Sequence, residues 1–359
     1  MEPGGNCPAS RVAGNNVYMD ENIILRVRKL NTSFKTEDGV IPIVKDVDFD
    51  VKRGTILAVV GESGCGKSVT MNSVCRLLGK NAQIEAEAID YMQQEEDGSV
   101  HPVHMKDLTN TSKEMRALRG KEISMIFQDP MSSLNPVYKV GRQVMEALLQ
   151  HQKMSKQEAM AQVIEMFKKL GIPDPENRVN NYPFEFSGGM KQRVVIAIAM
   201  INNPQLLIAD EPTTALDVTI QAQIMELMVR LKEEQQKTII LITHNMGLVA
   251  ETADEVAVMY MGRVVESGTA DQIFAYPAHP YTDALMRSVP VLGAMEDGKE
   301  LATIPGQTPN PKDVTDGCEF ANRCDKCMDC CKTGLVGNHE VEPGHFVRCH
   351  LFDGKGVRS

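Results

Sequence analysis

The chain of 359 residues contains no tryptophan, and aromatic residues make up only 5% of it. It also has no long apolar run: the longest, at residues 194–201, and others such as 239–242 fall far short of the roughly 20 residues that cross a bilayer. The first ten residues, MEPGGNCPAS, lack the basic and apolar segments that direct secretion. We therefore expect no membrane-spanning segment and no export, and place the chain in the cytosol.

Positive charge is also in short supply. The sequence has 38 lysine and arginine residues against 48 aspartate and glutamate residues, which gives a formal net charge of −10. An acidic chain lacks the basic face that binds nucleic acid through its phosphates, so we expect no nucleic-acid partner. Hydrophobic residues at 42% and charged residues at 24% are ordinary values for a globular protein and exclude wholesale disorder.

Composition divides the chain into three parts. Residues 1–21 are rich in glycine, asparagine and proline and are predicted to form a flexible leader. Residues 22–276 carry strand and helix patterns and are predicted to form the main domain. Residues 277–359, called the C-terminal extension below, are rich in proline, glycine and cysteine.

The main domain alternates buried strands with helices. Short, wholly apolar runs at residues 55–60, 205–209 and 238–243 are typical of strands covered on both faces of a parallel sheet. A helical pattern at residues 220–231 separates the last two strands. This βαβ alternation predicts an α/β fold with a mainly parallel sheet.

Two further regions are predicted to flank that core. Residues 23–53 alternate around a turn at residues 37–39, and residues 84–119 are polar, so we expect a peripheral antiparallel β region there. Apolar residues recur at helical spacing within residues 141–170. We therefore place a helical subdomain at about residues 129–200.

A phosphate-binding loop follows the first buried strand. The segment GESGCGKS satisfies the pattern G-x-x-x-x-G-K-S between a strand and a predicted helix at residues 69–78. Backbone N–H groups of such a loop converge on a phosphate, its lysine neutralises the β/γ oxygens, and its serine hydroxyl is a Mg²⁺ ligand. The residues that we expect to bind the nucleotide here are Gly61, Glu62, Ser63, Gly64, Cys65, Gly66, Lys67, Ser68 and Val69.

Two acids end the second buried strand. Because the carboxyl ends of parallel strands meet at one edge, Asp210 and Glu211 are predicted to lie beside the phosphate loop. Asp210 is placed to hold Mg²⁺, together with Ser68, and Glu211 to act as general base for an attacking water.

The segment YPFEFSGGMKQR at residues 182–193 resembles the signature sequence of ABC-type ATPases. The resemblance implies the P-loop NTPase fold of that family. It also implies a head-to-tail dimer, in which Ser187, Gly188 and Gly189 close the ATP site of a second ATP-binding subunit. Whether that subunit is a sister chain or a second copy stays open.

The same resemblance assigns roles to four more residues. Gln128 looks like the lid glutamine that reaches the Mg²⁺ and the attacking water, and His244 like the switch histidine at the γ-phosphate. Asp217 is similar to the aspartate of the loop across the dimer interface. Phe34 is the candidate for the aromatic that stacks on adenine. The chain departs from the family in having Asn245 where aspartate usually follows the histidine.

Three segments outside these motifs resemble the oligopeptide/dipeptide (peptide/nickel) permease ATPases: QDPMSSLNP after residue 127, HPYTDAL at 279–285, and IPG with GCEFANRC at 304–324. This resemblance implies an ATPase that powers peptide import from the cytoplasmic face of the membrane. It implies two transmembrane permease subunits and an extracytoplasmic binding protein as partners. A nickel or other small-solute importer is the alternative within the family; a soluble ABC ATPase acting on nucleic acid or ribosomes is the alternative from another class.

Six of the nine cysteines lie between residues 318 and 349, which in a reducing compartment predicts a metal site rather than disulfides. The resemblance implies a four-iron, four-sulfur cluster in the extension, and the family's cysteine spacing selects Cys318, Cys324, Cys331 and Cys349 as its ligands. Cys327 and Cys330 are alternative ligands. Tetrahedral zinc, with His345 or His350 replacing a thiolate, is one alternative to the cluster, and free thiols are the other.

Overall fold

The computed structural model describes residues 22–37, 39–95, 97–129, 133–214, 216–288 and 317–354, with short pieces at 304, 306–310, 312 and 357. The predicted leader at residues 1–21, part of the predicted lid loop at 130–132, and Ala215 lie outside these ranges. So does much of the start of the C-terminal extension.

A central sheet of eight strands forms the middle of the molecule, in the order β12-β13-β11-β10-β3-β9-β8-β7. Its strands β10, β3, β9, β8 and β7 run parallel. They span Glu255–Tyr260, Ile56–Val60, Thr238–Thr243, Leu206–Asp210 and Ile123–Ile126. The three strands predicted from apolar runs are confirmed, and every residue of β3, β8 and β9 is buried.

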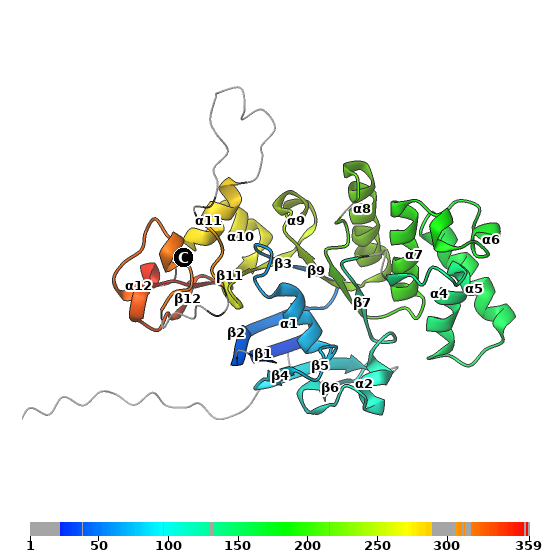
Figure 1. Cartoon of the computed structure of the whole chain (residues 1–359), viewed down its shortest axis with the longest axis horizontal. Helices are drawn as coiled ribbons and strands as arrows, with labels where there is room; N and C mark the ends of the chain where they lie inside the picture. Colours follow the sequence, from blue (N-terminus) through cyan, green and yellow to red (C-terminus); the bar gives the residue numbers. More distant parts are fainter. Residues whose placement is uncertain are drawn as a thin grey trace, which may run out of the picture.

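An antiparallel sheet lies below the central sheet in the view of Figure 1. Its strands are β1 (Ile23–Thr36), β2 (Gly39–Lys52), β4 (Ala82–Glu85), β5 (Ala88–Gln94) and β6 (Val100–His104). The predicted hairpin around residues 37–39 and the peripheral β region are thus confirmed. The short helices η1 (Met105–Asp107) and α2 (Lys113–Leu118) were not predicted, because they are too short to show helical periodicity.

Helices cover the central sheet and extend it at one end. Figure 1 shows α1 on the side of the antiparallel sheet, α8 and α9 on the other side, and a helical group at the end opposite the C-terminal extension. The covering helices are α1 (Lys67–Val74), α8 (Val218–Gln235) and α9 (Met246–Thr252). The group comprises α4 (Val140–Leu149), α5 (Lys156–Lys169), α6 (Pro175–Arg178), η2 (Pro183–Glu185) and α7 (Gly188–Met200).

Helix α1 is shorter than the sequence indicates. It was expected at residues 69–78 but ends at Val74, and Arg76 just beyond it has a left-handed backbone with φ of 54°. A left-handed residue stops the helical hydrogen-bond ladder. The apolar pattern alone could not reveal this stop.

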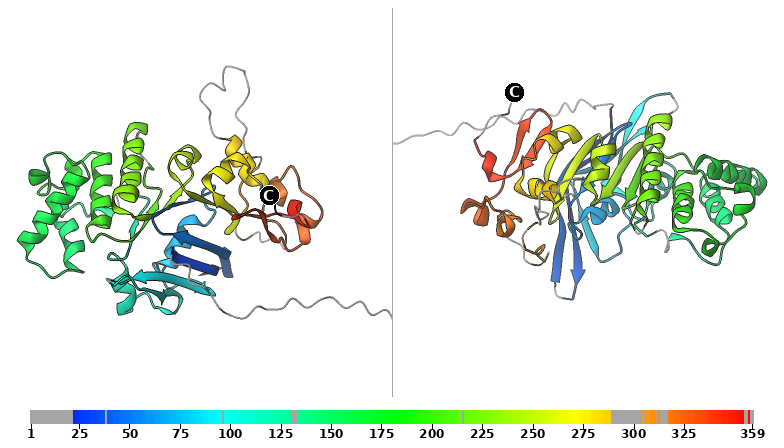
Figure 2. Two further views of the ribbon diagram at one scale, coloured as in Figure 1. Left: turned by 180° about the vertical axis from the view of Figure 1, so that it is seen from behind. Right: turned by 90° about the horizontal axis from the view of Figure 1, so that it is seen from above.

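The C-terminal extension continues the central sheet, which the sequence did not predict. Strand β13 pairs antiparallel with β11, so that Glu266 lies opposite Val347, and Figure 2 shows this part of the chain against the rest of the sheet from two further sides. The elements from β11 onward are β11 (Arg263–Thr269), α10 (Ala270–Ala275), α11 (Pro280–Arg287), η4 (Ala321–Arg323), α12 (Cys330–Thr333), β12 (Asn338–Glu342), β13 (His345–Arg348) and η5 (His350–Phe352). The predicted boundary at residues 276/277 therefore lies between two strands, β11 and β13, that pair with each other in the central sheet.

A buried carboxylate holds this junction. Glu266, which is 1% exposed, accepts hydrogen bonds from the backbone N–H groups of Ala278 and His279 at 2.7 and 2.9 Å. His345 Nε2 lies 2.8 Å from its Oε1. Because a buried carboxylate needs such partners, these contacts fix the extension on β11.

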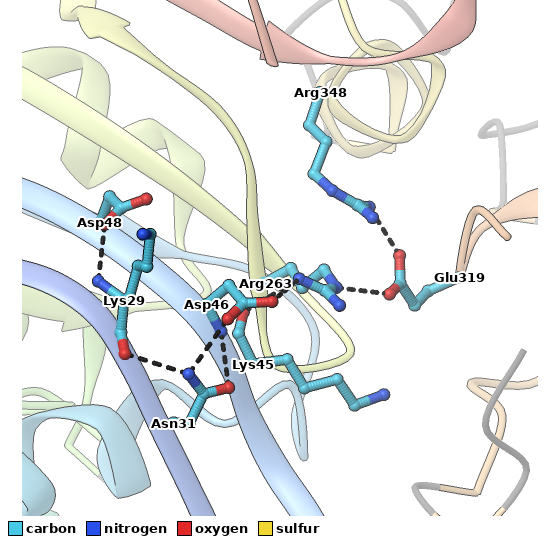
Figure 3. A network of polar contacts seen from close by, with 8 residues as sticks. All are labelled: Lys29, Asn31, Lys45, Asp46, Asp48, Arg263, Glu319 and Arg348. Atoms are coloured by element: carbon cyan, nitrogen blue, oxygen red, sulfur yellow. Dashed lines mark hydrogen bonds and ion pairs between the residues drawn. The ribbon is translucent and has the colours of Figure 1, made fainter. Parts of the chain in front are cut away.

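A second polar network ties the extension to β2 (Figure 3). Glu319 accepts hydrogen bonds from Arg263 of β11 at 2.6 Å and from Arg348 of β13 at 2.8 Å. Arg263 also donates to Asp46 of β2 at 3.1 Å. The segment that carries Glu319 is therefore held by two strands of the central sheet.

The buried His279 predicts a loss of stability in acid. Burial lowers the pKa of its imidazole from 6.5 to about 3, so below pH 6.5 the unfolded chain binds a proton that the folded chain excludes. The free energy of unfolding should then fall by roughly 1 kcal/mol per pH unit as the pH drops. His279→Asn, which keeps an acceptor for the N–H of Tyr281, should show a shallower fall in urea unfolding between about pH 6.5 and 4. Slopes equal to that of wild type, or the same change in the exposed control His101→Asn, would contradict this account.

Candidate functional site

The phosphate loop joins β3 to α1 through conformations that favour glycine. Gly61 has φ of 147°, and a Cβ there would lie 2.2 Å from the carbonyl oxygen of Met259. Gly66 has φ of 95° and directly precedes α1. The loop therefore packs against β10 while its end turns into the first N–H groups of a helix, where an anion is stabilised.

Lys67 is the first residue of α1, and its side chain reaches back to the start of the loop. Its side chain is buried, and Nζ donates hydrogen bonds to the carbonyl oxygens of Gly61 at 2.7 Å and Glu62 at 2.9 Å. Burial lowers the pKa of its ammonium, whereas the nearby carboxylates of Glu211 and Asp210 oppose that shift. The ammonium group of Lys67 is thus close enough to the carboxylates of Asp210 and Glu211 to be stabilised by them.

Ser68 and Asp210 meet as the sequence predicted. The hydroxyl of Ser68 donates a hydrogen bond to Asp210 Oδ1 at 2.9 Å. Burial raises the pKa of Asp210, and the bond from Ser68 offsets part of that rise. Hydroxyl and carboxylate oxygens at this distance are a donor set that suits Mg²⁺.

Three side chains form polar contacts with the carboxylate of Glu211. Thr214 Oγ1 and Gln128 Nε2 donate to its Oε2 at 2.8 and 3.0 Å, and His244 Nδ1 lies 3.3 Å from its Oε1. Burial would raise the pKa of Glu211, but these hydrogen bonds together lower it, so the group is an ionised carboxylate at neutral pH. Its backbone is left-handed, with φ of 46°, a strained conformation that places the side chain at the end of β8.

Thr214 is a residue of this cluster that the sequence did not reveal. It follows Glu211 in a turn whose backbone hydrogen bond runs from Thr214 N–H to the Glu211 carbonyl at 3.1 Å. Threonine three residues after a carboxylate is a frequent turn pattern, so the sequence carries no specific signal. Asn245, the departure from the family pattern, caps α9 by accepting from the N–H groups of Gly247 and Leu248.

Comparisons with known proteins give one family. A profile described as "ABC transporter" matches residues 44–214, and one described as "Oligopeptide/dipeptide transporter, C-terminal region" matches residues 265–331. The dipeptide transport ATP-binding protein DppD of Bacillus subtilis is 48% identical over 92% of this chain and 95% of its own. The chain belongs to the ABC transporter ATP-binding subunits of the oligopeptide/dipeptide type.

Other relatives and solved structures agree. The oligopeptide transport ATP-binding protein AppD of Bacillus subtilis is 45% identical over 94% of this chain and 99% of its own. The oligopeptide transport ATP-binding protein OppD of Haemophilus influenzae is 46% identical over 87% and 92%. The dimeric, post-hydrolysis structure of the ATP-binding cassette MJ0796 with ADP and Pi superposes with a TM-score of 0.57, at 25% identity, over 68% of this chain and 98% of that one. The ABC-type P-loop NTPase fold is thereby established.

The ABC signature segment lies away from the phosphate loop of the same chain. Ser187 caps α7 by accepting from the N–H of Met190, and α7 packs against α4 and α5 in the helical group seen in Figures 1 and 2. Gly188 and Gly189 form the first turn of α7. Asp217 is exposed and caps α8 by accepting from Ile220 N–H at 3.0 Å.

Phe34 lies in β1, between β2 and β4, and pairs with Ala82 of β4. It also pairs with Ile41 of β2 and is partly exposed. Two residues further along β2, the carbonyl oxygen of Ile43 lies 3.1 Å from where a Cβ of Gly66 would be. The hairpin therefore passes beside the phosphate loop, with Phe34 close to that passage.

The four cysteines that the family spacing selects line one small cavity. Cys318, Cys324, Cys331 and Cys349 share it with His279 and His350, whereas Cys330 is exposed. Burial raises the pKa of the Cys318 thiol to about 12 and that of Cys349 to about 11, which favours protonated thiols in the protein alone. Within the described ranges no three His, Cys, Asp or Glu side chains meet the geometry of a metal site, so a bound metal would require these thiols to move closer together.

No helix in the described part of the ABC subunit is both long enough and apolar enough to span a bilayer.

Proposed function

We propose that the chain hydrolyses ATP to drive uptake of dipeptides or oligopeptides, as the ATP-binding subunit of an ABC importer at the cytoplasmic face of the membrane. The observation that carries the proposal is the meeting of Gln128 and His244 on the carboxylate of Glu211, next to Lys67 and the Ser68–Asp210 pair. Three of these contacts join residues from distant parts of the sequence. The family's peptide-transporting relatives supply the substrate class.

The phosphate loop would bind the triphosphate. Lys67 is the group that neutralises the β/γ oxygens, after exchanging its contacts to the loop carbonyls for phosphate oxygens. Ser68 and Asp210 would hold Mg²⁺, which supplies charge neutralisation on the transferred phosphoryl group. Phe34 is proposed to stack on the adenine.

Glu211 is proposed as the general base. A carboxylate that is ionised and partly exposed accepts a proton from a water aimed at the γ-phosphate. Thr214, Gln128 and His244 hold it in one orientation through the three contacts given above. Gln128 comes from a loop that follows β7, so a movement of that loop would reach the base directly.

Partners complete the site. Ser187, Gly188 and Gly189 lie away from the loop of their own chain, and Asp217 and Val218 are exposed, Val218 to 81%. We propose that they meet a second ATP-binding subunit, either a copy or a sister chain, in a head-to-tail dimer. Two transmembrane permease subunits and an extracytoplasmic binding protein would form the rest of the importer.

Reconstitution tests this function. The subunit would be inserted with its permease subunits and binding protein into proteoliposomes, and ATP-dependent accumulation of radiolabelled dialanine and of a labelled hexapeptide would be measured. Accumulation that stops with Glu211→Gln supports the proposal. Uptake of a nickel chelate but neither peptide would assign the chain to the nickel alternative, and ATPase activity stimulated only by RNA or ribosomes would contradict an import function.

We propose as a second site the cysteine cavity, with Cys318, Cys324, Cys331 and Cys349 holding a four-iron, four-sulfur cluster, or else zinc. The shared cavity supports this choice, and the exposure of Cys330 favours Cys331 as the third ligand. The extension would then be a cysteine-rich metal domain.

Substitution at the cavity is expected to remove the metal. Cys318→Ser should lower the iron content and visible absorbance of protein purified without oxygen to a small fraction of wild type, because one of four thiolates is lost. Cys330→Ser is the matched control, since its side chain lies outside the cavity, and should keep both signals. Zinc in place of iron would select the alternative. Wild-type protein with neither metal, or Cys318→Ser with unchanged metal, would refute the site.

A further inference from the structure

An arginine of the C-terminal extension forms an ion pair with a glutamate of the phosphate loop. Arg323 donates from Nη1 to Glu62 Oε2 at 2.6 Å and from Nη2 to Glu62 Oε1 at 3.0 Å, a two-pronged pairing. The arginine is 9% exposed and its Nη1 also lies 3.3 Å from the hydroxyl of Tyr260. Charge-assisted pairs of this geometry are among the stronger polar contacts in proteins.

The extension holds the same residue of the loop a second time. The backbone N–H of Glu62 donates to the hydroxyl of Tyr281, on α11, at 2.8 Å. Tyr281 is fully buried and packs with Tyr260 and Phe320, at ring distances of 4.6 and 5.4 Å. Both the backbone and the carboxylate of Glu62 are thus fixed by residues beyond position 259.

The segment that carries Arg323 is itself immobilised. Glu319 is bound by Arg263 and Arg348, and the N–H of Cys318 donates to the carbonyl oxygen of Cys331 at 2.7 Å. Cys318 and Cys324, on either side of Arg323, both line the cysteine cavity. The guanidinium is therefore presented to the loop from a fixed support.

The negative charge of Glu62 bears on how well the loop can bind the triphosphate of ATP. Glu62 is an acid within a loop that would bind three phosphates, and its side chain is one quarter exposed. An unpaired carboxylate there would repel the triphosphate through a medium of low dielectric constant. Pairing with Arg323 neutralises that charge and keeps the carboxylate turned toward the extension.

We propose that Arg323 is a positioning residue of the ATP site, which neutralises Glu62 and holds the phosphate loop open for nucleotide. The inference rests on the ATP site proposed above. It makes the extension a part of the nucleotide-binding machinery. Arg323 acts on nucleotide binding, through its contacts with Glu62.

A double-mutant cycle that removes the two charges singly and together tests this role in the full-length chain. Arg323→Ala should raise the Kd for Mg-ATP and the KM of ATP hydrolysis about tenfold, while kcat changes less than about twofold. The carboxylate of Glu62 would keep the hydrogen bond from Thr308 but lose its positively charged partner beside the phosphates. Adding Glu62→Gln to Arg323→Ala should restore most of the affinity, to within about threefold of Glu62→Gln alone. A purely structural role for Arg323 predicts no such rescue, since the double variant has lost more contacts.

Arg287→Ala is the matched control, because Arg287 is an exposed arginine of the same extension that pairs with Asp283 one turn earlier on α11. Thermal unfolding checks that each variant is folded; if Arg323→Ala is not, Arg323→Lys gives the same test with a smaller expected loss, about threefold. The inference is overturned if Arg323→Ala binds ATP like Arg287→Ala, or if Glu62→Gln does not rescue it. Failure of the wild-type chain to bind ATP would instead refute the ATP site itself.

Discussion

Replacing Glu211 with glutamine is expected to slow ATP hydrolysis by about 10²- to 10⁴-fold while nucleotide binding stays within a few-fold of wild type. Glutamine keeps the shape and an acceptor for the bonds from Gln128 and Thr214, but it cannot take a proton from water. ATP should therefore accumulate in an assembled site, and the dimer should persist. Phosphate release and size-exclusion chromatography with Mg-ATP measure the two effects.

Glu226→Gln is the control for this substitution, because it makes the same chemical change on the exposed face of α8. Its turnover should equal that of wild type. Hydrolysis by Glu211→Gln at the wild-type rate would exclude Glu211 as the base. Loss of ATP binding along with turnover would mean that the glutamate maintains the site's structure instead.

Replacing Lys67 with alanine is expected to weaken nucleotide binding itself, by about 100-fold, since a hydrogen bond to a charged group contributes about 1.5–3 kcal/mol and the lysine can make more than one. The substitution also leaves the carbonyl groups of Gly61 and Glu62 without their buried donor. Isothermal titration calorimetry with Mg-ATP and Mg-ADP measures the change.

Lys80→Ala, an exposed lysine beyond the end of α1, controls for the loss of one positive charge and should leave both affinities unchanged. AMP, which lacks the β- and γ-phosphates, is titrated as well. A loss of affinity for AMP equal to that for ATP would show that Lys67 does not act on the β/γ-phosphates. The melting temperature of the same Lys67→Ala sample shows whether the variant is folded.

The parts of this site that lie in continuous segments were predictable from sequence. The phosphate loop from Gly61 to Ser68 has its glycines at positions where the backbone requires them, and the buried strands before Gly61 and Asp210 are short apolar runs. Parallel strands with short connections bring their carboxyl ends together, which is why Ser68 and Asp210 were expected to meet.

Contacts between residues far apart in the chain could not be predicted from the sequence. Arg323, in η4, and Tyr281, on α11, contact the phosphate loop from more than 200 residues away in the sequence. Neither residue stands in a pattern that signals contact with a nucleotide. Strands β10 and β11 were also missed. The apolar run of β10 is as long as that of β3 but is not followed by a recognisable motif, and β11 is largely polar and carries no such run.

The pairing of β13 with β11 bears on how this protein can be dissected. A truncated version ending near residue 276 would uncover the edge of β11 and leave the carboxylate of Glu266 without the N–H groups of Ala278 and His279 and without His345. Unpaired edge strands of this kind form hydrogen bonds with strands of other molecules and promote aggregation. The ATPase cassette of this chain is therefore not a detachable module, and engineered fusions should preserve the chain through residue 354.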